Sequence, residues 1–381
     1  MNNLGCRLPI RFGPSTRDTS LEADLQARLD SGHRVFAVGD IHGHLATFRA
    51  LLHRLRLKPD DRVVCLGDMI DRGPDSSGVV DLLRSHPQLV CLKGNHEQMA
   101  AQSVSADGVF EAWEPWMSRG GKSTYGSYIV AADGDLYEAK ARMRDDFTWL
   151  DSLPSQIVLD QHRLVHAGYD PGVSMNRQSE RELLWIRKVW YKHQEPVDAR
   201  RTVFFGHTTT TKLGDSAGDV AFSDHGLADG RPAWACLDVG AYNHVAPGIA
   251  AINLADLRVT KQPTLRCDRW FDEQADSIGR SGTWQTNDGR KEAMVADSFG
   301  LRALANRSRR ASIAEQEALR ALERAGLMPS RPLKPDVGSP MVTDEHGSSW
   351  MGPTSFRVYR RRPQPSHHAC GPISARARQL G

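Results

Sequence analysis

Five short apolar segments of the chain each lead into a polar residue of a type that binds metal ions. The segments and the residues that follow them are 35–38 with Asp40, 63–66 with Asp68, 89–92 with Asn95, 164–165 with His166, and 203–205 with His207. Apolar runs of this length, several of them rich in valine, are typical of buried strands. A glycine precedes most of the polar residues, and glycine lets the backbone turn tightly where a strand ends. The pattern therefore predicts a sheet with polar side chains at its strand ends.

Helical stretches separate the first strands. Apolar residues recur at helical spacing over 45–55, and the stretch 79–83 shows the same period. Strand, helix and strand in this order predict βαβ units and a core sheet with parallel strands. Sheets of this kind bind ligands at the carboxyl ends of their strands.

Helix and strand character also alternate further along the chain. Residues 98–155 are predicted to be mostly helical, and strand character returns from Ile157 to about Val259. We expect the later strands to complete a second sheet. The predicted fold class is α/β, or α+β in some schemes. It is a β-sandwich of mixed sheets flanked by helices, followed by a largely irregular C-terminal extension.

Composition bears on partners and on the cellular compartment. A net charge of +3 over 381 residues does not indicate binding to nucleic acid or to a membrane surface. The six cysteines are scattered without a CxxC pair, which favours a reducing compartment. No stretch approaches the roughly 18 apolar residues of a membrane helix, and the N-terminus lacks the apolar core of a signal peptide. The sequence thus predicts a soluble, cytoplasmic protein.

Three segments carry the residues with the clearest chemistry, namely 39–43 (GDIHG), 67–73 (GDMIDRG) and 94–97 (GNHE). Together they supply carboxylate, imidazole and amide oxygen from three successive strand ends, a mixture of ligands that suits manganese or iron. An aspartate or histidine after a single strand is often only a turn residue or a helix cap. Six such positions together are not explained in that way.

These segments resemble the metal-dependent phosphoprotein phosphatase family within the calcineurin-like metallophosphoesterases. They are most similar to its bacterial branch, the lambda protein phosphatase-like proteins. The three motifs stand in the family's order, and 165–168 (VHAG) and 206–208 (GHT) complete the set. The resemblance covers about residues 34–258 and does not extend into the C-terminal region.

The resemblance implies a site for two divalent metal ions, with Mn²⁺ expected and Fe or Zn as other candidates. The implied ligands are Asp40, His42 and the bridging Asp68 for the first ion, and Asp68, Asn95, His166 and His207 for the second. In two-metal sites the ions share a water or hydroxide, and the resemblance implies that this hydroxide attacks phosphorus directly, without a phosphoenzyme.

The resemblance also implies which groups act on the substrate. His96 would protonate the departing alkoxide, and Asp71 would orient the His96 imidazole. Arg72 and Arg187 would hold the phosphate oxygens through bidentate, charge-assisted hydrogen bonds. Asn95 would be a further contact of the substrate phosphate.

The extent of the family resemblance sets the predicted domains. Residues 1–33 form a leader with a short helix, and residues 34–261 form the catalytic domain. Residues 262–381 form an Arg/Ser/Pro-rich extension, expected to be mostly disordered with one helix near 313–327, because its apolar content is too low to offset the entropy of ordering it. Two outcomes stay open for the extension: it is dispensable for catalysis, or Leu265–Trp284 packs against the sandwich.

Three functions of different class compete. A protein serine/threonine phosphatase is favoured by His96, Asp71 and Arg72. A symmetrical dinucleoside tetraphosphatase is the alternative, since its branch shares the metal motifs but tends to carry Asp where this chain has Glu97. A non-catalytic module is not supported, because every expected ligand is present. The expected partner is therefore a phosphoprotein or small phosphoester substrate, with no nucleic acid or membrane.

Overall fold

The computed structural model describes residues 11–103, 113–214 and 216–269, and three short strands between residues 341 and 358. The chain divides into two compact units, Met1–Ser330 and Arg331–Gly381. In the second unit, β11 (Met341–Thr343), β12 (Ser349–Met351) and β13 (Arg357–Val358) form an antiparallel sheet. These strands lie in the stretch that the sequence predicts to be largely irregular. The helix predicted near 313–327 lies outside the described residues.

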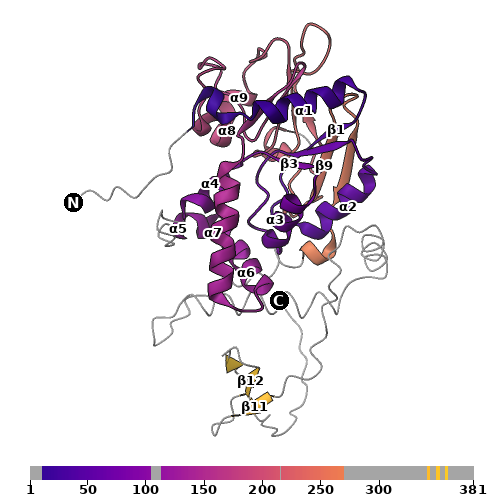
Figure 1. Ribbon diagram of the computed structural model, residues 1–381. Coiled ribbons are helices and arrows are strands. Elements are labelled where there is room, and N and C mark those ends of the chain that lie inside the picture. Colours follow the sequence, from indigo (N-terminus) through magenta and orange to yellow (C-terminus); the bar gives the residue numbers. More distant parts are fainter. Residues whose placement is uncertain are drawn as a thin grey trace, which may run out of the picture. The chain divides into compact units, whose positions relative to one another are not determined.

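Five strands of the first unit form a mixed sheet in the order β10-β9-β1-β2-β3. Strands β1, β3 and β9 of this sheet are labelled in Figure 1. The strands β1 (Val35–Val38), β2 (Arg62–Cys65) and β3 (Leu89–Cys91) run parallel, as predicted. Strand β9 (Gly248–Asn253) pairs antiparallel with β1, and β10 (Val259–Pro263) pairs antiparallel with β9. The helices α2 (Leu45–Leu55) and α3 (Ser76–Ser85) connect the parallel strands, and α2 begins and ends at the predicted residues.

The later part of the chain forms a second five-stranded sheet in the order β4-β5-β6-β8-β7. Its strands are β4 (Gln156–Val158), β5 (His162–Val165), β6 (Thr202–Phe205), β7 (Ala221–Phe222) and β8 (Trp234–Cys236). Here β5, β6 and β8 run parallel, and the edge strands β4 and β7 are antiparallel to their neighbours. The helices α8 (Glu180–Trp185), α9 (Lys188–Tyr191) and η3 (Thr210–Lys212) lie in the connections.

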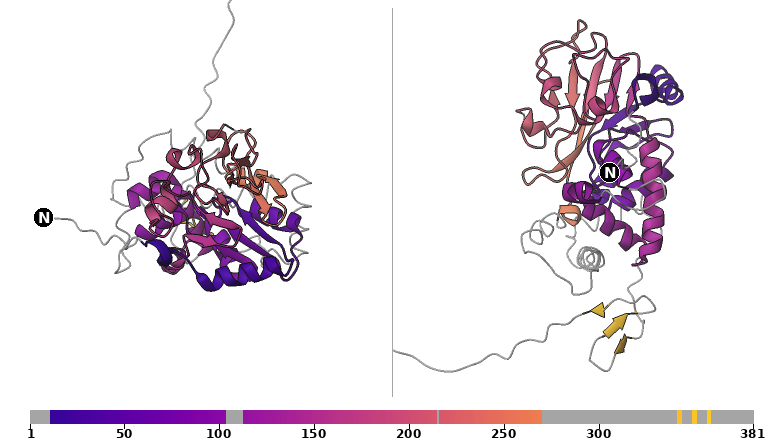
Figure 2. Two further views of the ribbon diagram at one scale, coloured as in Figure 1. Left: turned by 90° about the horizontal axis from the view of Figure 1, so that it is seen from above. Right: turned by 90° about the vertical axis from the view of Figure 1, so that its left-hand side faces the viewer.

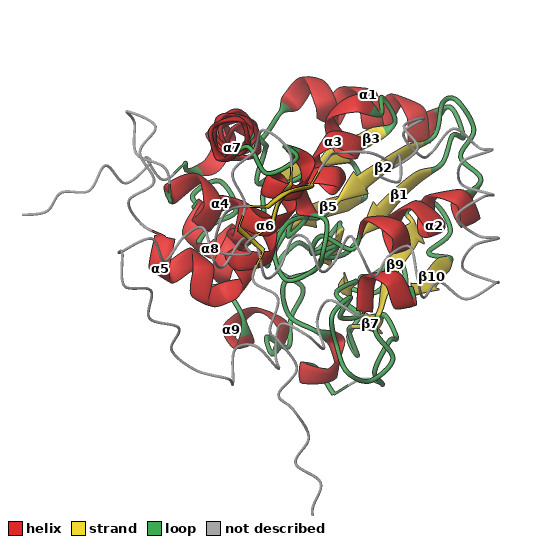
Figure 3. Ribbon diagram, turned by 90° about the horizontal axis from the view of Figure 1, so that it is seen from below, coloured by secondary structure: helices red, strands yellow, loops and turns green. Residues whose placement is uncertain are grey.

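Alternating side chains show that the two sheets pack face to face. In β1, Val35 and Ala37 belong to a buried cluster with Leu164 and Phe204 of the second sheet, whereas Phe36 belongs to the cluster under the helices. Strands buried on both faces have few polar positions, which explains the apolar runs in the sequence. In Figure 2 early (indigo) and late (orange) strands of the unit lie close together, as the pairing of β1 with β9 requires, and Figure 3 shows helices around the strands. The predicted sandwich of mixed sheets flanked by helices is confirmed.

A helical insertion joins β3 to β4, as predicted for residues 98–155. It consists of α4 (Asn95–Gln102), α5 (Trp113–Trp116), the π-helical turn η2 (Met117–Gly121), α6 (Lys122–Ala131) and α7 (Leu136–Ser152). Helix α7 packs against α4 and α6, and α6 also packs against α3. The ring of Trp116 meets that of Phe147 edge to face, with centroids 5.3 Å apart. Among the described helices, none has both the length and the apolar character to cross a membrane.

Both predicted ends of the catalytic domain lie inside packed structure. Before residue 34, the turn η1 (Gly13–Thr16) precedes α1 (Thr19–Asp30), whose Leu25 is fully buried in the cluster between the sheets. After residue 261, β10 continues to Pro263, and Asp268 is buried. The Asp268 Oδ2 atom accepts hydrogen bonds from the backbone N–H and the hydroxyl of Thr47 (2.8 and 2.7 Å). Residues 265–269 therefore contact helix α2 through Asp268, and the rest of 265–284 lies outside the described residues.

A chain that ends at residue 261 is expected to unfold at a lower temperature than one that ends at residue 269. The shorter chain loses the buried Asp268 carboxylate and its two bonds to Thr47, and a hydrogen bond to a charged group contributes about 1.5–3 kcal/mol. Thermal unfolding of both chains, with the full-length chain as reference, measures the difference. Equal melting temperatures for the two truncated chains would contradict this account of the boundary.

Candidate active site

The polar residues predicted at the strand ends lie together in the structure, and all are buried. Asp40 follows β1, Asp68 follows β2, and Asn95 begins α4 directly after β3. His166 and His207 follow β5 and β6 of the second sheet. Parallel strands of one sheet end on the same side, and the packing of the two sheets brings both sets of strand ends to one place.

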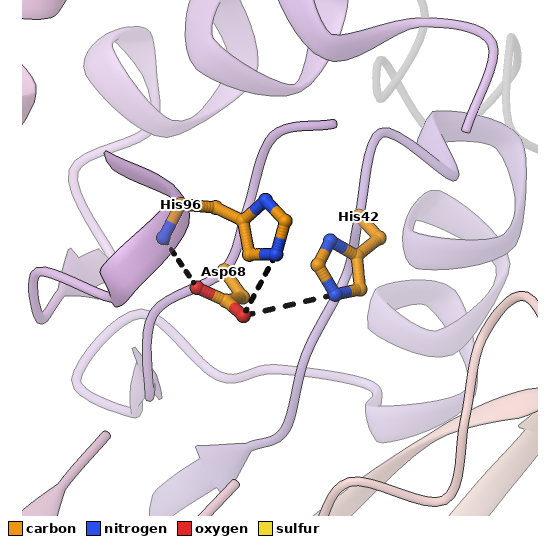
Figure 4. A group of neighbouring side chains, drawn as sticks. All are labelled: His42, Asp68 and His96. Carbon is orange, nitrogen blue, oxygen red and sulfur yellow. Dashed lines mark hydrogen bonds and ion pairs between the residues drawn. The ribbon is translucent and has the colours of Figure 1, made fainter. Parts of the chain in front are cut away.

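The Asp68 carboxylate lies at the centre of this cluster. Its Oδ2 atom lies 3.7 Å from His42 Nε2 and 3.8 Å from His96 Nε2 (Figure 4). Its Oδ1 atom lies 3.3 Å from His166 Nε2 and accepts a hydrogen bond from the backbone N–H of His96 (3.0 Å). One carboxylate thus contacts imidazoles from both sheets.

The remaining predicted ligands surround this centre. Asn95 Oδ1 lies 2.9 Å from His166 Nε2 and 2.7 Å from His207 Nδ1. Asp40 Oδ1 accepts from the backbone N–H of His207 (3.0 Å), and Asp40 Oδ2 lies 3.8 Å from His42 Nε2. The structure therefore brings all six predicted ligands into one buried group.

The backbone at these strand ends adopts conformations that are rare for residues with side chains. His42, Asp68 and His207 have φ angles of 48°, 48° and 63°, in the left-handed region. Such conformations cost free energy and are concentrated at functional sites. A side chain at Gly206 would be too close to the carboxylate of Asp40, since a Cβ atom there would lie 2.1 Å from Oδ1. Glycine at position 206 therefore allows the loop after β6 of the second sheet to approach Asp40, which follows β1 of the first sheet.

Two histidines turn Nε2 toward the cluster and Nδ1 toward the backbone. His42 Nδ1 lies 2.9 Å from the carbonyl oxygen of Ile70, and His166 Nδ1 lies 2.9 Å from that of Leu66. A carbonyl oxygen only accepts hydrogen bonds, so Nδ1 carries the hydrogen in both rings. In His42, Nε2 then presents a lone pair, which accepts from Arg72 (2.7 Å). In His166, Nε2 faces the oxygens of Asp68 and Asn95 and would present a lone pair once a metal ion displaced its proton.

The carboxyl groups of the cluster differ in how well their surroundings stabilise the negative charge. Burial, followed by the charges of Asp238 and Asp68, raises the pKa of Asp40 well above its usual range. Burial also raises the pKa of Asp238 to about 6. Burial acts in the same direction on Asp68, but the charges of His166, His96 and His42 and the hydrogen bond from His166 together outweigh it, and the pKa of Asp68 is well below its usual range. The pKa of His166 is raised to about 9, because the Asp68 carboxylate outweighs the effect of burial.

His96 and Arg72 form the second part of the site. His96 Nδ1 lies 2.6 Å from Asp71 Oδ2. The Arg72 guanidinium contacts His96 Nε2 (3.0 Å) and His42 Nε2 (2.7 Å) and lies over the ring of Tyr242, 4.3 Å from its centroid. A positive charge therefore lies beside the imidazoles that the sequence assigns to metal binding and to proton transfer.

Arg187 approaches the site from the second sheet. It precedes α9, and its Nη1 atom donates to the carbonyl oxygen of His207 and to Thr208 Oγ1 (3.1 Å each). Both arginines named in the sequence analysis thus lie beside predicted ligands.

The region that carries this site matches a known family. The family model for calcineurin-like phosphoesterases matches residues 33–237, more than half of the chain. The chain belongs to the calcineurin-like phosphoesterase family. It is accordingly a metal-dependent phosphoesterase, and the family resemblance inferred from the motifs is confirmed.

Several curated relatives of this phosphoesterase are bacterial enzymes. Serine/threonine-protein phosphatase 1 of Salmonella typhimurium is 30% identical over 201 residues, which are 51% of this chain and 88% of the relative. Serine/threonine-protein phosphatase 2 of Escherichia coli is 29% identical over 51% of this chain and 85% of the relative. A symmetrical bis(5'-nucleosyl)-tetraphosphatase of Methylococcus capsulatus is 30% identical over 36% of this chain and 44% of the relative.

The donor atoms fit the divalent metal ions that the phosphoesterase family implies. Two groups have ligand atoms within 4.8 Å of one another, His42 with Asp68 and His96, and Asp68 with His166 and His207. Asp68 belongs to both, as a bridging ligand would. The Nε2 atom of His207 is buried and has no hydrogen-bond partner within the described part of the chain. Cations would add the positive charge that the buried carboxylates lack.

Asp238 is a site residue of the phosphoesterase that the sequence analysis missed. It follows β8 as Asp40 follows β1, it is buried, and its carboxylate accepts from the N–H of Gly240 (3.1 Å). Its charge raises the pKa of Asp40. The signal was present, since the apolar run 233–237 also ends in an aspartate.

Glu97 supports the loop after β2. Its buried carboxylate accepts from the backbone N–H groups of Asp68 and Met69 (2.8 Å each) and of Ile70 (3.2 Å). It therefore shapes the loop that presents Asp68. From the sequence, Glu97 is a possible discriminator between the two substrate classes. In the structure its carboxylate contacts backbone N–H groups of the loop.

Removal of metal ions with a strong chelator is expected to abolish hydrolysis by this phosphoesterase, and Mn²⁺ is expected to restore it best. The physical reason is the group of buried carboxyl groups and imidazole nitrogens around Asp68, which a divalent ion would bind in place of protons. Mass-spectrometric metal analysis, run alongside the assay, shows whether activity follows metal content. Full activity in a sample with no bound metal would contradict the assignment of this site.

Proposed function

We propose that the chain is a protein serine/threonine phosphatase that hydrolyses phosphate monoesters with two metal ions. The group of Arg72, His96 and Asp71 beside the two candidate metal groups is the observation that carries the proposal. It combines a phosphate-binding cation and a proton donor at one place. The relatives named as serine/threonine-protein phosphatases, of which the chain covers 85–88%, support it. The catalytic domain then includes the sandwich and residues up to 269.

The proposed ligands are Asp40, His42 and Asp68 for one ion, and Asp68, Asn95, His166 and His207 for the other. When bound, the ions, with Mn²⁺ as the first candidate, would lower the pKa of a shared water and offset charge on the phosphoryl oxygens. The chain's contribution is to hold the ligand atoms in place before binding. The backbone contacts of His42 and His166 through Nδ1 support this, because they fix both rings.

Asp40 is a better ligand than His96 for the ion at His42. Both side chains lie close enough to share an ion with His42. Asp40 Oδ2 lies 3.8 Å from His42 Nε2, and His96 Nε2 lies 3.8 Å from Asp68 Oδ2. Asp40 offers a carboxylate oxygen, and a cation bound there would favour its ionised form, which burial and the charges of Asp238 and Asp68 disfavour. His96 instead pairs with Asp71, which favours proton transfer as its task.

Arg72 and Arg187 are the proposed phosphate-binding groups, with Asn95 beside them. Arg72 would lose its acceptor on His42 when His42 binds a metal ion, and its guanidinium would then be available to phosphate oxygens. Arg187 is fixed by its bonds to His207 and Thr208. A planar guanidinium binds two oxygens of a phosphate at once.

His96 is the proposed general acid. Its Nδ1–H donates to the Asp71 carboxylate, so the other ring nitrogen, Nε2, faces the cluster. In the structure Nε2 accepts from Arg72 (3.0 Å). Once Arg72 has turned to the substrate phosphate, a proton on Nε2 is the one that His96 would deliver to the leaving oxygen. The negative charge of Asp71 stabilises the imidazolium that carries this proton.

A symmetrical dinucleoside tetraphosphatase is the second candidate. The relative with that name is as similar in sequence as the phosphatases, although the chain covers less than half of it. Glu97 favours neither candidate, because its carboxylate contacts backbone N–H groups of the loop. Substrate choice therefore has to be measured.

A direct comparison of substrates is expected to favour the phosphoprotein. In Mn²⁺, kcat/KM should be higher for a phosphoserine peptide than for diadenosine tetraphosphate, with p-nitrophenyl phosphate as a reference for intact chemistry. A higher kcat/KM for the dinucleotide would replace the first proposal by the second.

Exchange of His96 for asparagine is expected to reduce turnover without loss of metal. A general acid contributes roughly 10²–10⁴-fold, and the loss should be largest for phenyl phosphate. It should be smaller for p-nitrophenyl phosphate, whose leaving group is stable without a proton. Asp68→Asn should instead reduce the metal content, because it removes the carboxylate charge shared by both groups. Equal metal loss in the two variants would show that the roles are assigned wrongly.

A further inference from the structure

Two side chains outside the metal cluster hold the Asp71 carboxylate, which is fully buried. The Nε1–H of Trp116 donates to both carboxylate oxygens, each 3.0 Å away. The hydroxyl of Thr124 donates to Oδ1 at 2.6 Å. Oδ2 also faces His96 Nδ1. The two donors come from the helical insertion, at the end of α5 and in α6, and not from the loops at the strand ends.

The backbone between these donors is shaped for the same contact. Gly120 has a φ angle of 118°, which breaks the helical path between Trp116 and Thr124. Its carbonyl oxygen accepts from the backbone N–H of Arg72 (3.2 Å), and a Cβ atom at Gly120 would lie 2.8 Å from Arg72 Cγ. The bend therefore lets one short segment contact both Asp71 and Arg72.

The Asp71–Arg72 segment depends on these contacts because its backbone is strained. Both residues have left-handed φ angles, 73° and 70°, a conformation that costs free energy in residues other than glycine. The backbone N–H of Asp71 is itself bonded to Ser76 Oγ (3.0 Å) and to Thr124 Oγ1 (2.9 Å). The insertion thus offsets part of that cost and fixes the plane of the carboxylate.

We propose that Trp116 and Thr124 are positioning residues for the general acid. They hold the Asp71 carboxylate so that Oδ2 meets His96 Nδ1, and the His96 ring then presents Nε2 to the leaving group. The inference rests on the proposed function, in which His96 protonates the leaving oxygen. Through Trp116 and Thr124, the helical insertion between β3 and β4 thus takes part in proton delivery and not in metal binding.

Exchange of Trp116 for phenylalanine tests this role. The variant keeps a ring to pack on Phe147 but removes the N–H donor. We expect kcat for phenyl phosphate to fall about tenfold, and kcat for p-nitrophenyl phosphate to fall much less. Tyr128→Phe is the matched control, because it removes another buried aromatic donor of the same insertion, the bond from Tyr128 to Asp146 (2.7 Å). The control should leave the ratio of the two rates unchanged.

A second variant covers the case in which Trp116→Phe does not fold. Thr124→Val removes the hydroxyl at nearly constant volume, and Thr124→Ser keeps it. We expect the valine variant to lower the phenyl phosphate rate selectively, with unchanged metal content, and the serine variant to restore it. Equal losses on both substrates, or a loss that serine does not restore, would overturn the positioning role.

The double variant separates this inference from the proposed function. If Trp116 acts through His96, Trp116→Phe should have no further effect on phenyl phosphate in the His96→Asn background. Additive losses would overturn the inference while leaving the general acid in place. If His96→Asn alone shows no preference between the two substrates, the general acid of the proposed function is wrong. A selective effect of His96→Asn without one of Trp116→Phe overturns only the inference.

Discussion

The position of the Asp68 carboxylate is the constraint on which the rest of the structure depends. A buried carboxylate is costly unless it is paired, and Asp68 finds its partners on both sheets, His42 on one and His166 on the other. Its own loop is held by the buried carboxylate of Glu97. Closing the sandwich and forming the site are therefore one event, because neither sheet alone supplies the contacts that Asp68 needs.

The apolar core between the sheets lies directly beneath these groups. Ala37 and Leu66 are fully buried in it, and Asp40 and Asp68 follow them by three and two residues. A shift of either strand by one residue would turn its core positions outward. The hydrophobic packing that stabilises the sandwich therefore also fixes the register of the strands, and with it the positions of the polar residues that follow them. The free energy gained by this packing offsets the cost of burying the polar cluster.

The sequence predicted the strand ends well because each is a local pattern of apolar run and polar residue. It predicted less where contacts join distant parts of the chain. Trp116 and Thr124 lie 45 and 53 residues from Asp71, and Thr47 lies 221 residues from Asp268. No local period marks such hydrogen bonds. The contact of Asp268, which lies beyond the predicted boundary at 261, is of the same kind, since it joins the fold through buried hydrogen bonds and not through an apolar run.

The two parts of the site are supported in different ways. The proposed ligands extend from strand ends whose sheets are buried on both faces, so their positions follow from the most tightly packed part of the unit. The proposed acid depends on hydrogen bonds to a helical insertion that bends at Gly120. Hydrogen bonds depend on geometry more sharply than apolar packing does. Small changes in the insertion would therefore act on the proposed proton transfer before they reach the proposed ligands.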